Sequence, residues 1–152
     1  MIDSTLAAFL EEGLGIHLGT RNARLEPNGA RIIAVKVDDR TQCLSLYVPE
    51  TAASRVMPDL QTNGLAAVAF ARPIDDRACQ VKGTFLDVRP ARSDERPFVA
   101  AQWDRFLSNL ERIGVARAGT ANWVTWPDVV ITLQATEVFN QTPGVGAHVP
   151  IA

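Results

Sequence analysis

Residues 78–87 read Ala-Cys-Gln-Val-Lys-Gly-Thr-Phe-Leu-Asp, a segment in which polar and apolar side chains alternate. Because successive side chains of a β-strand point to opposite faces, this alternation predicts a strand. The polar residues would share one face and the apolar residues the other: Gln80, Lys82 and Thr84 against Val81 and Phe85. Two interpretations of the polar face stay open. Either solvent wets it, as it wets one face of many antiparallel sheets, or a polar ligand binds there.

Gly83, which lies between the two apolar residues, is the second informative feature of this segment. A glycine inside a strand often marks a β-bulge or a place where another group approaches the backbone closely. The residues therefore predict an irregular strand at this point, and they do not by themselves identify a reaction.

The length and composition predict one globular domain over residues 1–152. The chain has 152 residues, of which 47% are hydrophobic, and this is enough to build a single core. The formal net charge is −2, whereas a general nucleic-acid-binding domain is usually basic. We therefore expect no nucleic-acid partner.

The sequence also predicts a cytoplasmic protein without a membrane partner. No apolar run is long enough to cross a bilayer, and the start, Met-Ile-Asp-Ser, lacks the basic and apolar regions of a signal peptide. Cys43 and Cys79 lie in apolar, strand-like runs, which is typical of free, buried and non-catalytic thiols. The cysteines and the two histidines, His17 and His148, show no metal-ligand spacing, so no metal site is expected.

Toward the N-terminus from residues 78–87, the hydrophobic periodicity predicts two helices and four strands. In chain order we expect a helix over 3–12, strands over 14–20, 31–37 and 43–48, a helix over 50–62 and a strand over 65–71. The turn signal Pro27-Asn28-Gly29 is expected to separate the first two strands, and the second and third are expected to form a hairpin.

Toward the C-terminus, the pattern predicts a long helix and a final strand. Apolar side chains recur at alternating spacings of four and three over residues 94–113, which indicates a helix with one face in the core. A loop over 115–126 carries Trp123 and Trp126. A strand is expected over 128–139 and a tail over 140–152.

These elements predict an α+β fold that is mainly β, with six antiparallel strands and flanking helices. Because strands at an open edge must be covered or paired, a sheet of this size favours a small barrel. No phosphate-binding glycine loop, nucleophile elbow or acid–base pair stands out in the sequence.

The order and spacing of several segments are similar to those of one family. The segments are Arg31-Ile-Ile-Ala-Val-Lys36, Tyr47, Ser54-Arg55, Asn63-Gly64 before an Ala/Val strand, Gln80-Val-Lys-Gly83, and the tail beginning at Val138. Together they resemble the pyridoxamine 5′-phosphate oxidase-like family of split barrels that bind flavin mononucleotide (FMN). The resemblance extends over roughly residues 5–146.

The resemblance implies a six-stranded Greek-key split barrel that forms a homodimer, with an FMN site at each side of the subunit interface. It implies that the flavin phosphate is held by basic and hydroxyl side chains: Arg31, Lys36, Ser54 and Arg55. It places Gln80 and Lys82 beside the flavin ring or ribityl chain, and adds Tyr47 to the cofactor-binding set. Charge-assisted hydrogen bonds from arginine are well suited to a phosphate dianion.

The sequence departs from the family at two points. The family has a pair of basic residues after the serine, whereas Arg55 is followed here by Val56, so one charge is missing. The family's C-terminal arginine and histidine pattern for substrate binding is also absent, which argues against pyridoxine-phosphate oxidation.

Two classes of function remain from the sequence. The first is a flavin-dependent oxidoreductase that acts on a small molecule, with nicotinamide as an electron source. The second is a dimer that binds or senses a flavin, deazaflavin or haem without turnover. A third, weaker alternative is an empty dimeric scaffold. Catalytic residues are not identified by the sequence.

Overall fold

A computed structural model of the protein describes residues 1–123 and 126–151. Its helices and strands, in chain order, are α1 (Ser4–Leu10), β1 (Gly15–Arg21), β2 (Pro27–Ile32), β3 (Ala34–Asp38), β4 (Cys43–Val48), α2 (Glu50–Asn63), β5 (Leu65–Ala71), β6 (Ala78–Pro90), α3 (Arg96–Arg112) and β7 (Val129–Asn140). Two short 3-10 helices, Ser93–Glu95 and Arg117–Thr120, flank α3. Parts of the loop predicted over 115–126 and of the tail predicted over 140–152 lie outside the described residues.

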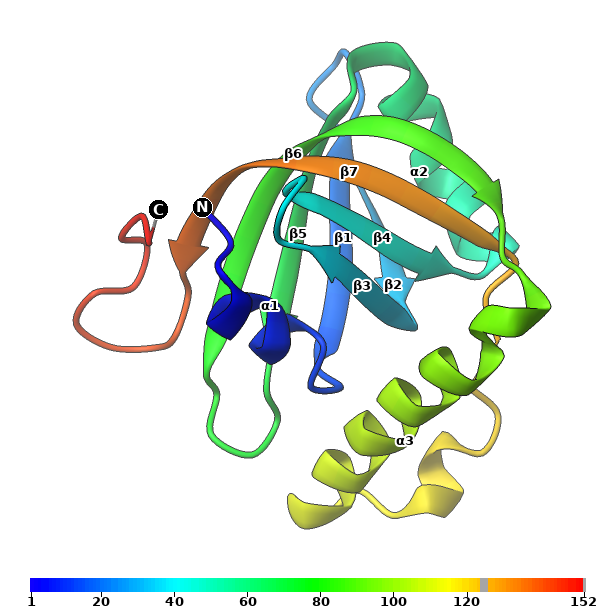
Figure 1. Ribbon diagram of the computed structural model, residues 1–152, viewed down its shortest axis with the longest axis vertical. Helices are drawn as coiled ribbons and strands as arrows, with labels where there is room; N and C mark the ends of the chain where they lie inside the picture. The colour runs from blue at the N-terminus through cyan, green and yellow to red at the C-terminus, as the bar shows by residue number, and fades with distance from the viewer. Residues whose placement is uncertain (124–125, 152) are drawn as a thin grey trace.

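The strands form one antiparallel sheet in the order β2-β1-β5-β6-β7-β4-β3. Strands β2 and β3 lie at opposite ends of this order, yet only Ile33 separates them in the sequence. The sheet must therefore curl until its two edges come close together. At the junction between β2 and β3, the amide of Ile33 donates to the carbonyl of Tyr47 in β4 at 2.9 Å. Figure 1 shows the resulting half-closed barrel, with the long strands β6 and β7 arching together over β4.

The prediction of six strands is wrong by one, because the strand expected over 31–37 is two strands. Its backbone breaks at Ile33, so that β2 pairs with β1 and β3 pairs with β4. The turn expected at Pro27-Asn28-Gly29 is also wrong, since these residues begin β2. Pro27 is tolerated there because it is the first residue of an edge strand, where its missing N–H is not needed.

The main core fills the barrel, and a second apolar cluster lies outside it under α3. The barrel core contains inward side chains of all seven strands and of α1 and α2, including Val56, which is 0% exposed. The second cluster joins Ile33, Ala34 and Tyr47 to Val99, Trp103 and Phe106 of α3. Gln102 fixes the helix on β3, because its amide group both accepts from the Val35 N–H (2.7 Å) and donates to the Val35 carbonyl (2.9 Å).

The alternation predicted for residues 78–87 is confirmed in β6. Cys79 and Val81 are buried in the barrel core, whereas Lys82 and Thr84 are exposed on the outer face. The irregularity predicted at Gly83 is also confirmed, because the pairing of β6 with β7 shifts between Lys82 and Gly83. Cys43 and Cys79 are both free thiols, as expected. Cys79 is buried, which raises the pKa of its thiol to about 12, whereas Cys43 is only half-buried, so the expectation of burial is wrong for Cys43.

Replacing Gly83 with alanine is expected to destabilise the fold by about 1–3 kcal/mol, because the added methyl group would overpack the bulge. A Cβ at this position would lie 2.5 Å from the backbone carbonyl oxygen of Gln134. Urea unfolding of Gly83→Ala would measure the loss. Gly119→Ala is the matched control, since a Cβ there meets nothing within 4 Å. Equal stability of the two variants would refute the close approach of Gly83 to the Gln134 carbonyl.

Among the described residues, no helix is both long and apolar enough to cross a membrane.

Candidate functional site

Arg31 lies on β2 within a cage of three aromatic rings, two from α3 and one from the loop before β7. Its guanidinium carbon is 3.8 Å from the ring centroid of Trp123, 5.1 Å from that of Trp103 and 5.3 Å from that of Phe106. We call these three side chains the aromatic cage. Such contacts attract a cation by about 0.5–2 kcal/mol, more when the pair is desolvated.

Arg31 is a half-buried cation without a counter-ion in the part of the chain that the structure describes. No carboxylate there lies within ion-pair distance of it, and no acceptor takes its N–H groups. Burial lowers its pKa from the ordinary value. His17 faces it across the β1–β2 ladder, and burial together with the Arg31 charge lowers the histidine pKa. An additional anion would therefore be stabilised at this position.

A cavity of about 290 Å³ opens beside Arg31. Its walls come from the end of β2, the start of α2, helix α3 and the loop before β7. The residues that line it are Arg31, Ile33, Pro49, Ala52, Trp103, Asn122 and Trp123. The start of α2 also lies at this cavity, but the Asp128 carboxylate already accepts from the Glu50 N–H there at 2.7 Å, so the helix dipole adds little to the Arg31 charge. The buried indole N–H of Trp103 has no hydrogen-bond partner in the described chain. The cavity thus combines apolar walls with donors that lack acceptors.

A second, larger hollow of about 410 Å³ lies on the outer face of the sheet. Small residues of β1, β5 and β6 form its floor, including Gly19, Ala67 and Gly83. Lys82 lines it, with its Nζ 3.9 Å from Glu137 Oε1 and 4.5 Å from the ring centroid of Phe139. We call this hollow the Lys82 groove. A floor of small residues permits a flat group to lie close to the backbone.

The other predicted phosphate ligands line neither cavity. Lys36 is exposed on β3, opposite Ser45, and Ser54 and Arg55 are exposed on α2. The Ser54 hydroxyl donates to the Thr51 carbonyl at 3.1 Å within the helix. Gln80 is half-buried on β6, two residues from Lys82 on the same face. One chain therefore holds the predicted residues at separate places: Arg31 beside the start of α2, and Lys82 in the outer groove.

Tyr47 is buried, and its hydroxyl group is already engaged within the protein. It donates to Glu95 Oε1 at 2.9 Å, and burial and the neighbouring carboxylate raise its pKa to about 12. The ring lies 6.0 Å from that of Phe98. Tyr47 thus links β4 to the turn that precedes α3, which is a structural role alongside the cofactor role that the resemblance implies.

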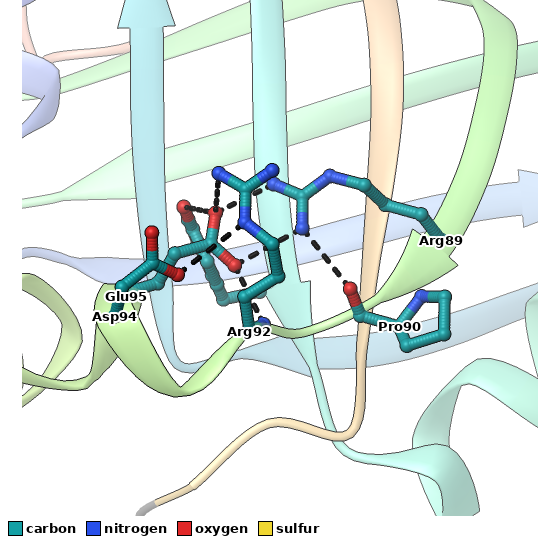
Figure 2. A network of polar contacts seen from close by, with 6 residues as sticks. Arg89, Pro90, Arg92, Asp94 and Glu95 are labelled. Carbon is teal, nitrogen blue, oxygen red and sulfur yellow. Dashed lines mark hydrogen bonds and ion pairs between the residues drawn. The ribbon is translucent and has the colours of Figure 1, made fainter.

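Glu95 is the centre of the polar network in Figure 2. Arg89 grips it with both terminal nitrogens, and the backbone N–H of Arg92 donates to it at 2.8 Å. Its side chain is only 11% exposed. The Arg89 guanidinium, together with the Arg92 amide and the Tyr47 hydroxyl, lowers its pKa from 4.5 to about 2. The network fixes the end of β6, the short helix Ser93–Glu95 and β4 relative to one another.

The sequence does not reveal the aromatic cage or the Glu95 network. Trp103 and Phe106 belong to the apolar stripe of the helix predicted over 94–113, and they do pack in an apolar cluster. The stripe gives no sign that the Arg31 guanidinium lies against both rings. Trp123 carries no periodic signal because it lies in a loop. Glu95 looks like an ordinary acidic residue at a helix N-terminus, and only the fold places Arg89 and Tyr47 beside it.

Neither a protein-family model nor a curated protein matches the sequence. Solved structures of the same fold do match, at low identity. HupZ of Group A Streptococcus has a TM-score of 0.58 and 16% identity, over 97% of this chain and 99% of that chain. A putative pyridoxamine 5′-phosphate oxidase of Lactobacillus delbrueckii has a TM-score of 0.55 and 15% identity, over 91% and 93% of the two chains. An FMN-binding protein of Syntrophomonas wolfei has a TM-score of 0.54 and 12% identity, over 96% and 84%.

These matches confirm the fold that the family resemblance implied. The chain has the split-barrel fold of the pyridoxamine 5′-phosphate oxidase-like FMN-binding proteins. At identities of 12–16% the likeness concerns the fold, and individual ligand contacts have to be argued from the residues of this chain.

Proposed function

We propose that the protein is a cytoplasmic homodimer that binds FMN and acts as a flavin-dependent oxidoreductase on a small molecule. The observation that carries this proposal is Arg31, a half-buried cation without a counter-ion at the mouth of a cavity beside a helix N-terminus. An anionic ligand would complete such a site. The shared fold with FMN-binding proteins supports a flavin phosphate as that anion.

The two cavities together fit a flavin better than either does alone. Sites for ligands of drug-like size generally occupy about 300–1,000 Å³, and the two measure about 290 and 410 Å³. Their linings are complementary in character: a cation and a helix start in one, and a floor of small residues beside Lys82 in the other. Because they are separate cavities in one chain, we propose that a second copy completes the site. Static light scattering at micromolar concentration would give a dimer mass, and a monomer mass would refute this part.

In this proposal, the residues of the chain bind and orient the cofactor. Arg31 donates to the phosphate, whereas Lys36, Ser54 and Arg55 line neither cavity of one chain and would have to reach the phosphate from the second copy. Gln80 and Lys82 lie beside the ring, where Lys82 favours negative charge. The flavin, when bound, supplies the two-electron redox chemistry.

A second candidate is a flavin-binding dimer without turnover. The Lys82–Glu137 ion pair favours it, because these charged side chains partner each other at the groove. Adding NADH or NADPH to the FMN-loaded protein without oxygen would separate the two. Bleaching of the flavin absorbance supports the oxidoreductase, whereas a persistent yellow colour with both donors supports the binding protein.

Replacing Lys82 with alanine is expected to change the redox behaviour of bound FMN more than its affinity. Loss of a cation beside the ring destabilises the reduced, anionic flavin, so the midpoint potential should become more negative. The affinity for FMN should change by no more than about threefold, since an exposed charge contributes little to binding. Spectroelectrochemical titration measures the first quantity and fluorescence titration the second. Arg21→Ala, at the same groove, is the control for a general loss of charge.

A further inference from the structure

We infer that the aromatic cage is a positioning device for phosphate recognition, and that Trp123 is the residue that fixes the Arg31 guanidinium. The inference rests on the proposed function, because it takes the flavin phosphate as the anion that Arg31 receives. It goes beyond that function by assigning a role to three aromatic residues through their contact with the arginine.

The geometry of the cage leaves only part of Arg31 free. Trp123 lies 3.8 Å from the guanidinium carbon, which is the distance of a ring stacked on a flat group. Trp103 and Phe106 approach to 5.1 and 5.3 Å. Among the described residues, no oxygen atom accepts a hydrogen bond from the Arg31 N–H groups. The N–H edge therefore keeps its donors for an oxyanion, in the fork geometry that suits phosphate.

The cage rests on a rigid support. Trp103 and Phe106 follow Gln102 in α3, and Gln102 anchors that helix to β3 with two buried hydrogen bonds. The two rings also pack against each other, with centroids 5.5 Å apart, and Trp103 contacts Trp123 at 6.1 Å. A free arginine side chain loses up to about 2 kcal/mol of rotamer entropy when it is held by a ligand. Arg31 is already held by the cage before a ligand arrives.

The aromatic cage bears on the position after Arg55, where the family has a second basic residue and this chain has Val56. Val56 is fully buried in the barrel core, so this position of α2 faces inward and cannot present a cation to the cavity. Phosphate affinity in this chain then depends on fewer cations, and the orientation of each one matters more. Fixing Arg31 in advance is one way to recover affinity without a second positive charge.

Trp123 is the cage residue that can be removed with the least damage to the fold. Its side chain is 36% exposed, whereas Trp103 and Phe106 are both 6% exposed and belong to the core under α3. The chain also provides a matched control. Trp126, on the same loop, lies 4.1 Å from the guanidinium carbon of Arg96 in α3, packs against the cluster under that helix and does not line the cavity.

The test is a titration of Trp123→Ala and Trp126→Ala with FMN and with riboflavin. We expect Trp123→Ala to weaken FMN binding by about three- to tenfold and to leave riboflavin binding unchanged, because the cage acts only through the phosphate. Trp126→Ala should bind both ligands as the wild type does. In an Arg31→Gln background, Trp123→Ala should have no further effect on FMN, which a general loss of structure would not produce.

Two results would overturn the inference: FMN affinity that is unchanged or increased in Trp123→Ala, or an equal loss for riboflavin. A wild-type protein that binds no FMN would instead refute the proposed function. The role of the cage is then tested with inorganic phosphate as the probe, by following the Arg31 Nε–H signal in NMR spectra. Phosphate should shift this signal at lower concentration in the wild type than in Trp123→Ala. Equal responses, or none in either protein, would overturn the inference on this second measurement as well.

Discussion

Arg31→Gln is expected to weaken FMN binding by about ten- to a hundredfold while riboflavin binding stays nearly unchanged. A hydrogen bond to a charged group contributes about 1.5–3 kcal/mol, and 1.4 kcal/mol corresponds to a factor of ten in affinity. The loss should be at the upper end because Arg31 is half-buried and has no other anion to bind in the described chain. Quenching of flavin fluorescence during titration gives both affinities.

Arg96→Gln is the control for this experiment, since Arg96 also stacks on a tryptophan but lies outside both cavities. Its FMN affinity should match that of the wild type. If Arg31→Gln lost FMN and riboflavin equally, Arg31 would support the pocket as a whole and the phosphate assignment would be wrong. Lys36, Ser54 and Arg55 would then be the remaining candidates for the phosphate.

Glu95→Gln is expected to lower the free energy of unfolding at pH 7 by about 2–3 kcal/mol. The change removes the negative charge that Arg89 grips, and leaves a partly buried cation without its partner. It also replaces a carboxylate oxygen, which accepts hydrogen bonds, by an NH₂ group that donates, although Tyr47, Arg89 and the Arg92 amide all donate to this side chain. Urea unfolding followed by tryptophan fluorescence would measure the loss, and Asp94→Asn, at an exposed neighbouring carboxylate, should change stability by less than about 0.5 kcal/mol.

The same network predicts the direction of the pH dependence. The pKa of Glu95 is about 2 in the folded protein, below its ordinary value of 4.5. A carboxylate with a depressed pKa stabilises the fold fully above the unfolded pKa, and this stabilisation is lost as the pH falls through the folded pKa. The stability difference between the wild type and Glu95→Gln should therefore be constant above about pH 5 and shrink between pH 4.5 and 2. A difference that does not vary over this range would contradict the assignment.

The fold was predictable where the sequence pattern is local. The alternation of residues 78–87, the glycine bulge and the apolar stripe of the long helix all have a period or a residue type that identifies them. The break at Ile33 has no such signal, because Ile32, Ile33 and Ala34 continue an apolar run. Only the need to join the two edges of a curled sheet forces the chain to change strands there. The strand count was wrong for this reason.

The candidate site was predictable only in part, and for a related reason. Resemblance identified Arg31 and Lys82 as residues of interest, but their neighbours are distant in the sequence. Trp103 follows Arg31 by more than 70 positions, and no periodicity relates an arginine on a strand to a tryptophan on a later helix. For Tyr47 the resemblance suggests a cofactor contact, whereas in the structure its hydroxyl group donates to Glu95. Contacts made by tertiary packing cannot be deduced from spacing.

The most direct test of the account is a titration of the wild-type protein with FMN, followed by quenching of flavin fluorescence. The account predicts saturation below about 100 micromolar, equivalent to a binding free energy beyond roughly −5.5 kcal/mol, with weaker binding of riboflavin. No saturation at that concentration would contradict flavin binding by this split barrel. Riboflavin bound as tightly as FMN would contradict the phosphate site at Arg31 while leaving the flavin pocket in place.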